Sequence, residues 1–259
     1  MTDLKISIIQ TSLIWEDIEA NLSKFGKLIK SLAGKTDLVI LPEMFNSGFS
    51  MNREKLAEEM NGVTIQWMRQ MAREANLNII GSLIVKDGEN YFNRLMWVGP
   101  GDIVGDYDKR HLFRMAEEHH YFKAGSQKFI GNLNGWNICP LICYDLRFPV
   151  WCRTQNESDL MIFIANWPEA RSHAWKTLLQ ARAIENQCYV AGVNIVGTDG
   201  NGKKYAGDSV IIDPMGKIIS SGFSGEEKIE TLTLSYDELS NFRKSFPFGL
   251  DADNFEIII

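Results

Sequence analysis

Three side chains that together could carry out acyl transfer stand far apart in this sequence. Glu43, Lys109 and Cys143 each follow an apolar run that is short enough to be one buried strand. A thiol is a nucleophile, a carboxylate is a base, and an ammonium stabilises the negative oxygen that develops when a carbonyl is attacked. If the fold brings the three together, the chain has the parts of a cysteine-dependent hydrolase.

Cys143 has the local setting of a functional residue. The segment before it, 136–142, is predicted to be a buried strand, and the polar residues after it indicate a turn before a helix that opens near Pro149. In α/β folds, sites form at the carboxyl ends of strands. The other cysteines, at positions 139, 152 and 188, are interpreted as small core residues.

Alternating strand and helix patterns run through the whole chain and predict one α/β domain over residues 1–259. Thr64 is expected to cap a helix, and Asp87-Gly88 to form a hairpin turn. Antiparallel hairpins favour mixed sheets over a purely parallel one. Strands are expected at 5–10, 38–41, 78–85, 91–98, 160–165, 189–196, 205–212 and 217–220, and amphipathic helices at 17–32, 64–76 and 172–187.

Composition narrows the class of partner. The chain has 259 residues, 27 lysines and arginines against 33 acids, and a net charge of -6. Without a basic block, nucleic acid and anionic membrane surfaces are not expected as partners. No apolar run reaches the ~18 residues of a membrane helix, and the N-terminus lacks a signal-peptide pattern, so we expect a cytoplasmic protein without disulfides.

Two segments resemble binding motifs but fail on spacing. Residues 117–120 (Glu-Glu-His-His) lack the His-x-x-x-His spacing of a metal site, so no metal is expected. Residues 197–204 fit Gly-x4-Gly-Lys, but Lys204 replaces the hydroxyl residue of a phosphate loop, and a strand pattern follows. Asp199-Gly-Asn201 lacks the later ligands of a calcium loop. A hairpin turn explains both of these last patterns.

The three candidate motifs together resemble the nitrilase superfamily of carbon–nitrogen hydrolases, and within it the bacterial omega-amidases. They read Leu41-Pro-Glu43-Met-Phe, Tyr107-Asp-Lys109-Arg-His-Leu-Phe and Leu141-Ile-Cys143-Tyr-Asp-Leu-Arg-Phe-Pro. The runs 46–49, 114–119 and 165–168 add to the likeness. The resemblance implies an α-β-β-α sandwich of two mixed sheets. It also implies a homodimer or larger homo-oligomer, to which the C-terminal segment, about 247–259, could contribute.

The resemblance also implies roles for individual residues. Glu43 would be the general base, Cys143 the nucleophile that forms a thioester, and Lys109 an oxyanion donor together with the backbone N–H of Tyr144. A second glutamate of the family aligns with Glu118, and Glu117 is the rival for that role. No cofactor is expected.

The substrate implied is the terminal amide of a short 2-oxo dicarboxylic monoamide, such as 2-oxoglutaramate. Arg171 is the first candidate for binding the carboxylate, and Arg147 is the second unless it braces the turn through Asp145. Phe113 and Trp167 are expected to wall the pocket. The alternatives are a nitrilase or an N-carbamoyl hydrolase of the same superfamily, and, outside enzymes, a thiol redox sensor or small-molecule binder.

Overall fold

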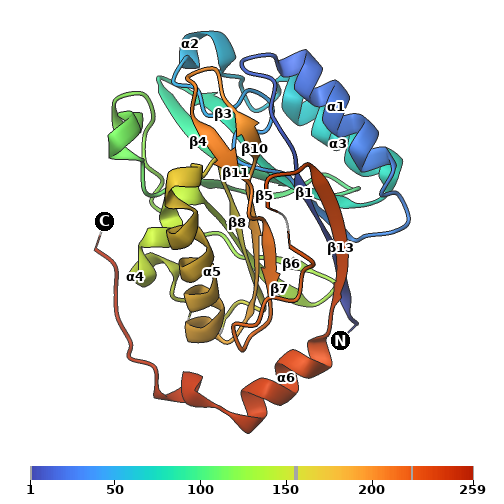
Figure 1. Cartoon of the computed structure of the whole chain (residues 1–259), viewed down its shortest axis with the longest axis vertical. Coiled ribbons are helices and arrows are strands. Elements are labelled where there is room, and N and C mark those ends of the chain that lie inside the picture. The colour runs from blue at the N-terminus through green and yellow to red at the C-terminus, as the bar shows by residue number, and fades with distance from the viewer. Residues whose placement is uncertain (1, 155–156, 223, 259) are drawn as a thin grey trace.

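Two β-sheets lie face to face in the computed structural model of the chain, with helices on their outer sides (Figure 1). The structure describes residues 2–154, 157–222 and 224–258. Buried residues of both sheets, among them Ile8, Leu95, Leu141 and Phe163, belong to one apolar cluster between them. Burial of this shared face is therefore what holds the sheets together.

The first sheet has six strands in the order β13-β1-β2-β3-β4-β5. The neighbours β1, β2 and β3 are parallel, whereas the other pairs are antiparallel, so the sheet is mixed. A two-residue connection at Gly88, whose φ is 58°, joins β3 to β4 in the predicted hairpin. The strands are β1 (Leu4–Gln10), β2 (Leu38–Ile40), β3 (Asn78–Asp87), β4 (Asn90–Val98), β5 (Ile103–Asp108) and β13 (Lys228–Leu234).

The second sheet has five strands in the order β12-β9-β8-β7-β6. Its centre, β7-β8-β9, is parallel, and both edge strands are antiparallel. A separate two-stranded hairpin is formed by β10 (Val196–Thr198) and β11 (Lys204–Ala206). The strands of the sheet are β6 (Gly131–Leu133), β7 (Trp136–Ile142), β8 (Leu160–Ile164), β9 (Tyr189–Val193) and β12 (Val210–Ile212).

Helices cover the outer face of each sheet, which gives the predicted α-β-β-α layering (Figure 1). On the first sheet lie α1 (Ile18–Lys30) and α3 (Val63–Ala75), whose apolar stripes pack into a second buried cluster. On the second sheet lies α5 (Ser172–Asn186). The remaining α-helices are α2 (Arg53–Leu56), α4 (Pro149–Cys152) and α6 (Tyr236–Ser245). Turns of 3-10 helix span Arg114–Ala116, Glu118–His120, Cys143–Arg147, Glu169–Arg171 and Phe248–Asp251.

Most predicted elements are confirmed, and four details were wrong. The predicted strand 189–196 ends at Val193 as β9, and Val196 begins β10 of the separate hairpin. Thr64 does not cap α3: Gly62 is the cap, and the Thr64 hydroxyl donates to Glu58 instead. The segment 205–212 is two strands, because Gly207 has a φ of 74° and breaks the extended backbone. Residues 217–220 form a single bridge through Ile218 rather than a strand. Among the described residues, no helix is long and apolar enough to span a bilayer.

Candidate active site

The three predicted residues follow three strands that belong to both sheets. Glu43 lies just beyond β2, Lys109 directly follows β5, and Cys143 directly follows β7. Each preceding strand is held by its sheet, so the position of each residue is set by a rigid element. The structure brings the three side chains together in a buried cluster between the sheets.

Lys109 is the centre of this cluster. Its ammonium lies 2.8 Å from Glu43 Oε1 and 2.9 Å from Glu118 Oε2, and all three side chains have no exposed surface. Burial by itself lowers the pKa of Lys109, but the charges of Glu118 and Glu43 outweigh it and raise that pKa. The lysine is therefore a permanent cation beside the thiol.

The structure distinguishes the two adjacent glutamates that the sequence left open. Glu118 is buried and accepts from the Lys109 ammonium and from the backbone N–H of Phe113, at 2.6 Å. Glu117 is exposed, with a left-handed backbone φ of 56° that turns the chain between two 3-10 segments. Only Glu118 can act on Lys109 directly. Burial, more than any other influence, raises the pKa of Glu118, while Lys109 opposes that rise.

Two asparagines that sequence reasoning did not assign fix the orientation of Glu43. Asn93, on β4, donates from Nδ2 to Glu43 Oε1 at 2.8 Å. Asn166, just after β8, donates its backbone N–H to Glu43 Oε2 at 2.8 Å and its side-chain amide to the Glu43 carbonyl. Both carboxylate oxygens are thus held by donors from two different sheets. In the sequence, Asn93 could have been recognised as a candidate site residue because it is a polar residue inside the apolar run 91–98.

Cys143 occupies a strained turn. Its backbone φ is 44°, in the left-handed region that non-glycine residues rarely adopt. Burial raises the pKa of the thiol well above its ordinary value, Glu43 raises it further, and Lys109 opposes the rise. The resting sulfur is therefore protonated at neutral pH and needs a base to become a nucleophile.

Asp145 holds this turn against the strand that carries Lys109. Its carboxylate accepts from the Tyr107 hydroxyl at 2.7 Å and from the backbone N–H groups of His111 and Ile142 at 2.9 and 3.2 Å. Of the two roles left open for Arg147, a brace of the turn through Asp145 has no contact to support it among the described residues. The Arg147 guanidinium instead lies 4.8 Å from the ring centre of Trp167.

Replacing Asp145 by Ala should lower the free energy of unfolding by about 3 kcal/mol, since several buried donors lose their acceptor and each costs roughly 1–3 kcal/mol. Urea unfolding measures the change. Asp106→Ala, at an exposed position on β5, is the matched control and should change stability by less than about 0.5 kcal/mol. Equal effects of the two substitutions would show that Asp145 does not brace the turn.

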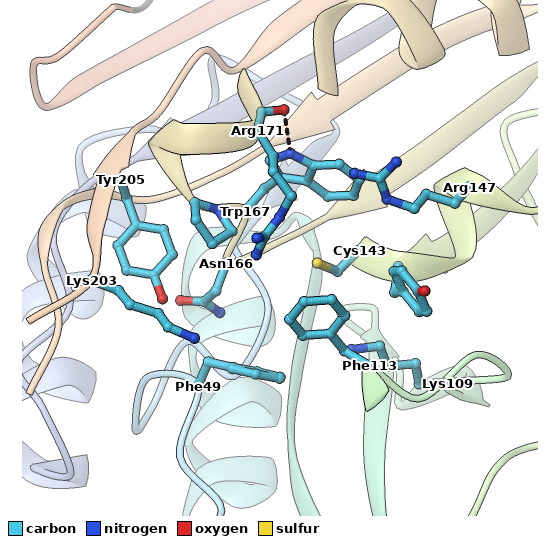
Figure 2. Close-up of a pocket in the computed structure, with 12 residues that line it drawn as sticks. Phe49, Lys109, Phe113, Cys143, Arg147, Asn166, Trp167, Arg171, Lys203 and Tyr205 are labelled. Carbon is cyan, nitrogen blue, oxygen red and sulfur yellow. Dashed lines mark hydrogen bonds between the residues drawn. The ribbon is translucent and has the colours of Figure 1, made fainter. Parts of the chain in front are cut away.

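A pocket of about 410 Å³, counted to its open mouth, lies over the Cys143 sulfur. Four residues predicted for the substrate site line it: Phe113, Arg147, Trp167 and Arg171. Figure 2 shows their side chains around Cys143. Tyr144, whose backbone N–H is the predicted oxyanion donor, also lines the pocket, and its ring packs against that of Phe113.

The charges around this pocket are one-sided. It is lined by Lys109, Arg147, Arg171 and Lys203, and by no carboxylate among the residues that the structure describes. Lys109 has its two buried glutamates, but within the described part of the chain the other three cations have no acidic side chain at ion-pair distance. The Arg171 guanidinium lies 5.1 Å from the ring centre of Phe113, which helps to place it. The pocket is suited to an anion.

Sequence reasoning missed five residues of the pocket. Phe49, Asn166 and Pro168 lie in runs that carried the family likeness but received no role. Lys203 lies in the segment interpreted as a hairpin turn, and Tyr205 begins the strand predicted at 205–212. The hairpin itself is confirmed, as β10 and β11. Its contribution to the pocket depends on long-range packing, for which the local pattern gave no signal.

The other three cysteines are buried and free, as predicted for core residues. Burial raises the pKa of Cys139 and of Cys188 to about 12. Among residues 2–154, 157–222 and 224–258, no group of His, Cys, Asp and Glu side chains has the arrangement of a metal site.

Known proteins share this architecture along nearly the whole chain. The Escherichia coli K12 protein "Omega-amidase YafV" is 46% identical over 99% of this chain and 100% of its own length. The Bacillus subtilis "2-oxoglutaramate amidase" is 34% identical over 93% of this chain and 95% of its own. The crystal structure of XC1258 from Xanthomonas campestris, described as a CN-hydrolase superfamily protein with an arsenic adduct in the active site, is 46% identical. It superposes with a TM-score of 0.96 over 99% of this chain and 100% of that one.

The two-sheet fold and its outer helices recur even where sequences have diverged. Saccharomyces cerevisiae Nit3, a member of the nitrilase superfamily, superposes with a TM-score of 0.86 at 23% identity, covering 95% of this chain and 94% of its own. Residues 5–244 match the carbon-nitrogen hydrolase family itself. The chain belongs to the carbon–nitrogen hydrolase family.

Proposed function

We propose that this protein is an omega-amidase, which hydrolyses the terminal amide of a short 2-oxo dicarboxylic monoamide such as 2-oxoglutaramate. The products are ammonia and the oxo diacid. The observation that carries the proposal is a buried thiol, flanked by Glu43 and Lys109, at the base of a pocket that three further cations line without partner acids among the described residues. The relatives named omega-amidase and 2-oxoglutaramate amidase support the same substrate class.

The first half of the reaction forms a thioester. Glu43 takes the proton of Cys143 as the sulfur attacks the amide carbon, and the carbonyl oxygen becomes an oxyanion. The Lys109 ammonium and the Tyr144 N–H donate to that oxygen. The protonated Glu43 then gives its proton to the amide nitrogen as the carbon–nitrogen bond breaks and ammonia leaves.

The second half returns the enzyme to its starting state. Glu43 takes a proton from water, whose oxygen attacks the thioester carbon. The carbon–sulfur bond breaks, the acid is released, and the proton on Glu43 returns to Cys143. Glu118 keeps Lys109 in place through both halves, since it holds the ammonium by two contacts of 2.9 and 3.0 Å.

The raised pKa of Cys143 supports an enzyme rather than a redox sensor. A sensor thiol needs a low pKa, exposure and often a resolving partner. Cys143 is buried, and burial also raises the pKa of Cys139, four residues before it, to about 12. A thiol deprotonated only at the moment of attack by a neighbouring base fits acyl transfer.

We further propose that the chain is one catalytic domain that acts in the cytoplasm as a homodimer, without metal or cofactor. Apolar side chains remain exposed near the C-terminal end, where Leu250 has 85% and Ile258 has 95% of its surface accessible. Exposed apolar side chains of this kind support a protein contact through the segment 247–259.

Replacing Arg171 by Met tests the substrate class. Arg171 is the forked cation at the pocket wall, and its loss should raise KM for 2-oxoglutaramate by roughly 10- to 100-fold while a neutral amide of similar length is affected much less. Ammonia release from both compounds measures the effect. An equal loss on both would dismiss the carboxylate role, and no ammonia from 2-oxoglutaramate with the unmodified protein would dismiss the proposed activity.

A further inference from the structure

The hairpin of β10 and β11 contributes one wall of the pocket. Lys203 and Tyr205 line the cavity, and Figure 2 shows them on the side away from Cys143, with Asn166 between. The side chain of Lys203 extends from the hairpin toward Phe49 and Asn166. Hydrolysis at the sulfur does not require a cation here, so the lysine has no part in the proposed chemistry.

The hairpin is held in a fixed place. Asp199 accepts from the backbone N–H groups of Asn201 and Lys203, each at 2.9 Å, and from the Tyr205 hydroxyl at 2.8 Å. These bonds close the turn and determine where Lys203 begins. The backbone of the hairpin is therefore already ordered before a ligand binds. Binding then loses less conformational entropy than it would if the hairpin had to become ordered.

Trp15 packs between the hairpin and the loop that carries Phe49. Its ring packs so closely on Gly200 that a Cβ there would lie 2.3 Å from it, and on Gly48, where a Cβ would lie 3.1 Å away. Gly48 directly precedes Phe49, another lining residue. One indole ring thus joins the loop that carries Phe49 to the hairpin that carries Lys203.

Lys203 faces a cavity that already holds positive charge. Within the described residues its ammonium has neither an ion pair nor a hydrogen bond, and the Arg147 and Arg171 guanidinium groups line the same small space. Like charges around one cavity repel each other, and an anion between them removes that cost.

We propose that Lys203 is a specificity residue, which binds the substrate carboxylate together with Arg171 at the end of the molecule remote from the scissile amide. Arg171 would hold the carboxylate with its fork, and Lys203 would neutralise it from the hairpin side. The inference rests on the proposed function and adds a residue to it. Lys203 would set the preference for anionic over neutral amides.

The chain supplies a matched control next to the residue itself. Lys203 directly precedes β11, and it lines the pocket together with Tyr205, whereas Lys204 between them does not. Lys203→Met and Lys204→Met remove the same charge from nearly the same place. A general effect of charge on the approach of an anion would appear in both variants.

Kinetics with 2-oxoglutaramate and a neutral amide test the proposal. Lys203→Met should raise KM for 2-oxoglutaramate about 10-fold with little change in kcat, and should leave the neutral amide nearly unchanged. Lys204→Met should resemble the unmodified protein, and Lys203→Arg should keep most of the affinity. Equal effects of the two methionine substitutions would overturn a direct contact.

A binding measurement separates this inference from the proposed activity. Calorimetric titration with the dianion 2-oxoglutarate requires no turnover, so it reports on Lys203 even if 2-oxoglutaramate is not hydrolysed. Its dissociation constant should rise about 10-fold in Lys203→Met and stay within about 2-fold in Lys204→Met. If 2-oxoglutarate does not bind the unmodified protein, or binds Lys203→Met equally well, the inference is wrong.

Discussion

Glu43→Gln should lower kcat for amide hydrolysis by about 10²- to 10⁴-fold, the usual contribution of a general base. Gln keeps the shape of the side chain but cannot take the Cys143 proton or pass one to ammonia. The loss should be large because the resting thiol has a raised pKa, and because burial leaves no bulk water to replace the base. Ammonia release over time measures it.

An ester substrate with the same acyl group should show that Glu43→Gln is slow in hydrolysing the thioester. An alkoxide leaves more readily than an amide nitrogen, so a slow acylation of Cys143 can still occur in Glu43→Gln, but hydrolysis of the thioester again lacks its base. The acyl group should therefore accumulate on the protein, and intact-mass measurement should detect it. Cys143→Ala should show no added mass under the same conditions.

Glu117→Gln is the matched control, because it makes the same chemical change at an exposed glutamate of the loop that carries Glu118. Its kcat should stay close to that of the unmodified protein. A Glu43→Gln variant that retains the amide rate would rule out Glu43 as the base. Added mass that persists in Cys143→Ala would rule out Cys143 as the nucleophile.

The sequence predicted the candidate site where the chemistry follows a strong local pattern. Lys109 and Cys143 come directly after a strand and Glu43 comes shortly after one, and strand ends are placed by the sheets that contain them. The same periodicity predicted α1, α3 and α5, since an apolar stripe at helical spacing has to be buried. Their coming together in space rested on family resemblance.

Residues whose role depends on packing between distant segments could not be predicted. Asn93, on β4, reaches Glu43 past the neighbouring strand β3, and a register shift by one residue would turn it to the other face. Lys203 lies 60 residues beyond Cys143 in the sequence and lines the pocket from a hairpin on which Trp15 packs at Gly200. The local pattern of a single sequence does not indicate contacts between segments that lie far apart in the chain.

Lys109→Met should destabilise the fold as well as the reaction. Methionine has nearly the size of lysine but leaves Glu43 and Glu118 buried without their cation. Removing one partner of a buried ion pair typically costs about 3–5 kcal/mol of unfolding free energy. The variant should also lose roughly 10²- to 10³-fold in kcat, because an oxyanion donor is gone. Urea unfolding and ammonia release measure the two effects.

The stability loss of Lys109→Met should depend on pH in a defined direction. Burial raises the pKa of Glu118 and Lys109 opposes the rise, so removal of the lysine should raise that pKa further. A carboxyl with a raised folded pKa stabilises the fold below its unfolded pKa, and that contribution disappears as pH rises through the folded value. The deficit against the unmodified protein should therefore be small near pH 5 and larger near pH 8. Lys123→Met, at an exposed position, should show neither loss. A deficit in Lys109→Met that is constant with pH would mean that cavity and packing effects, rather than uncompensated charge, determine its cost.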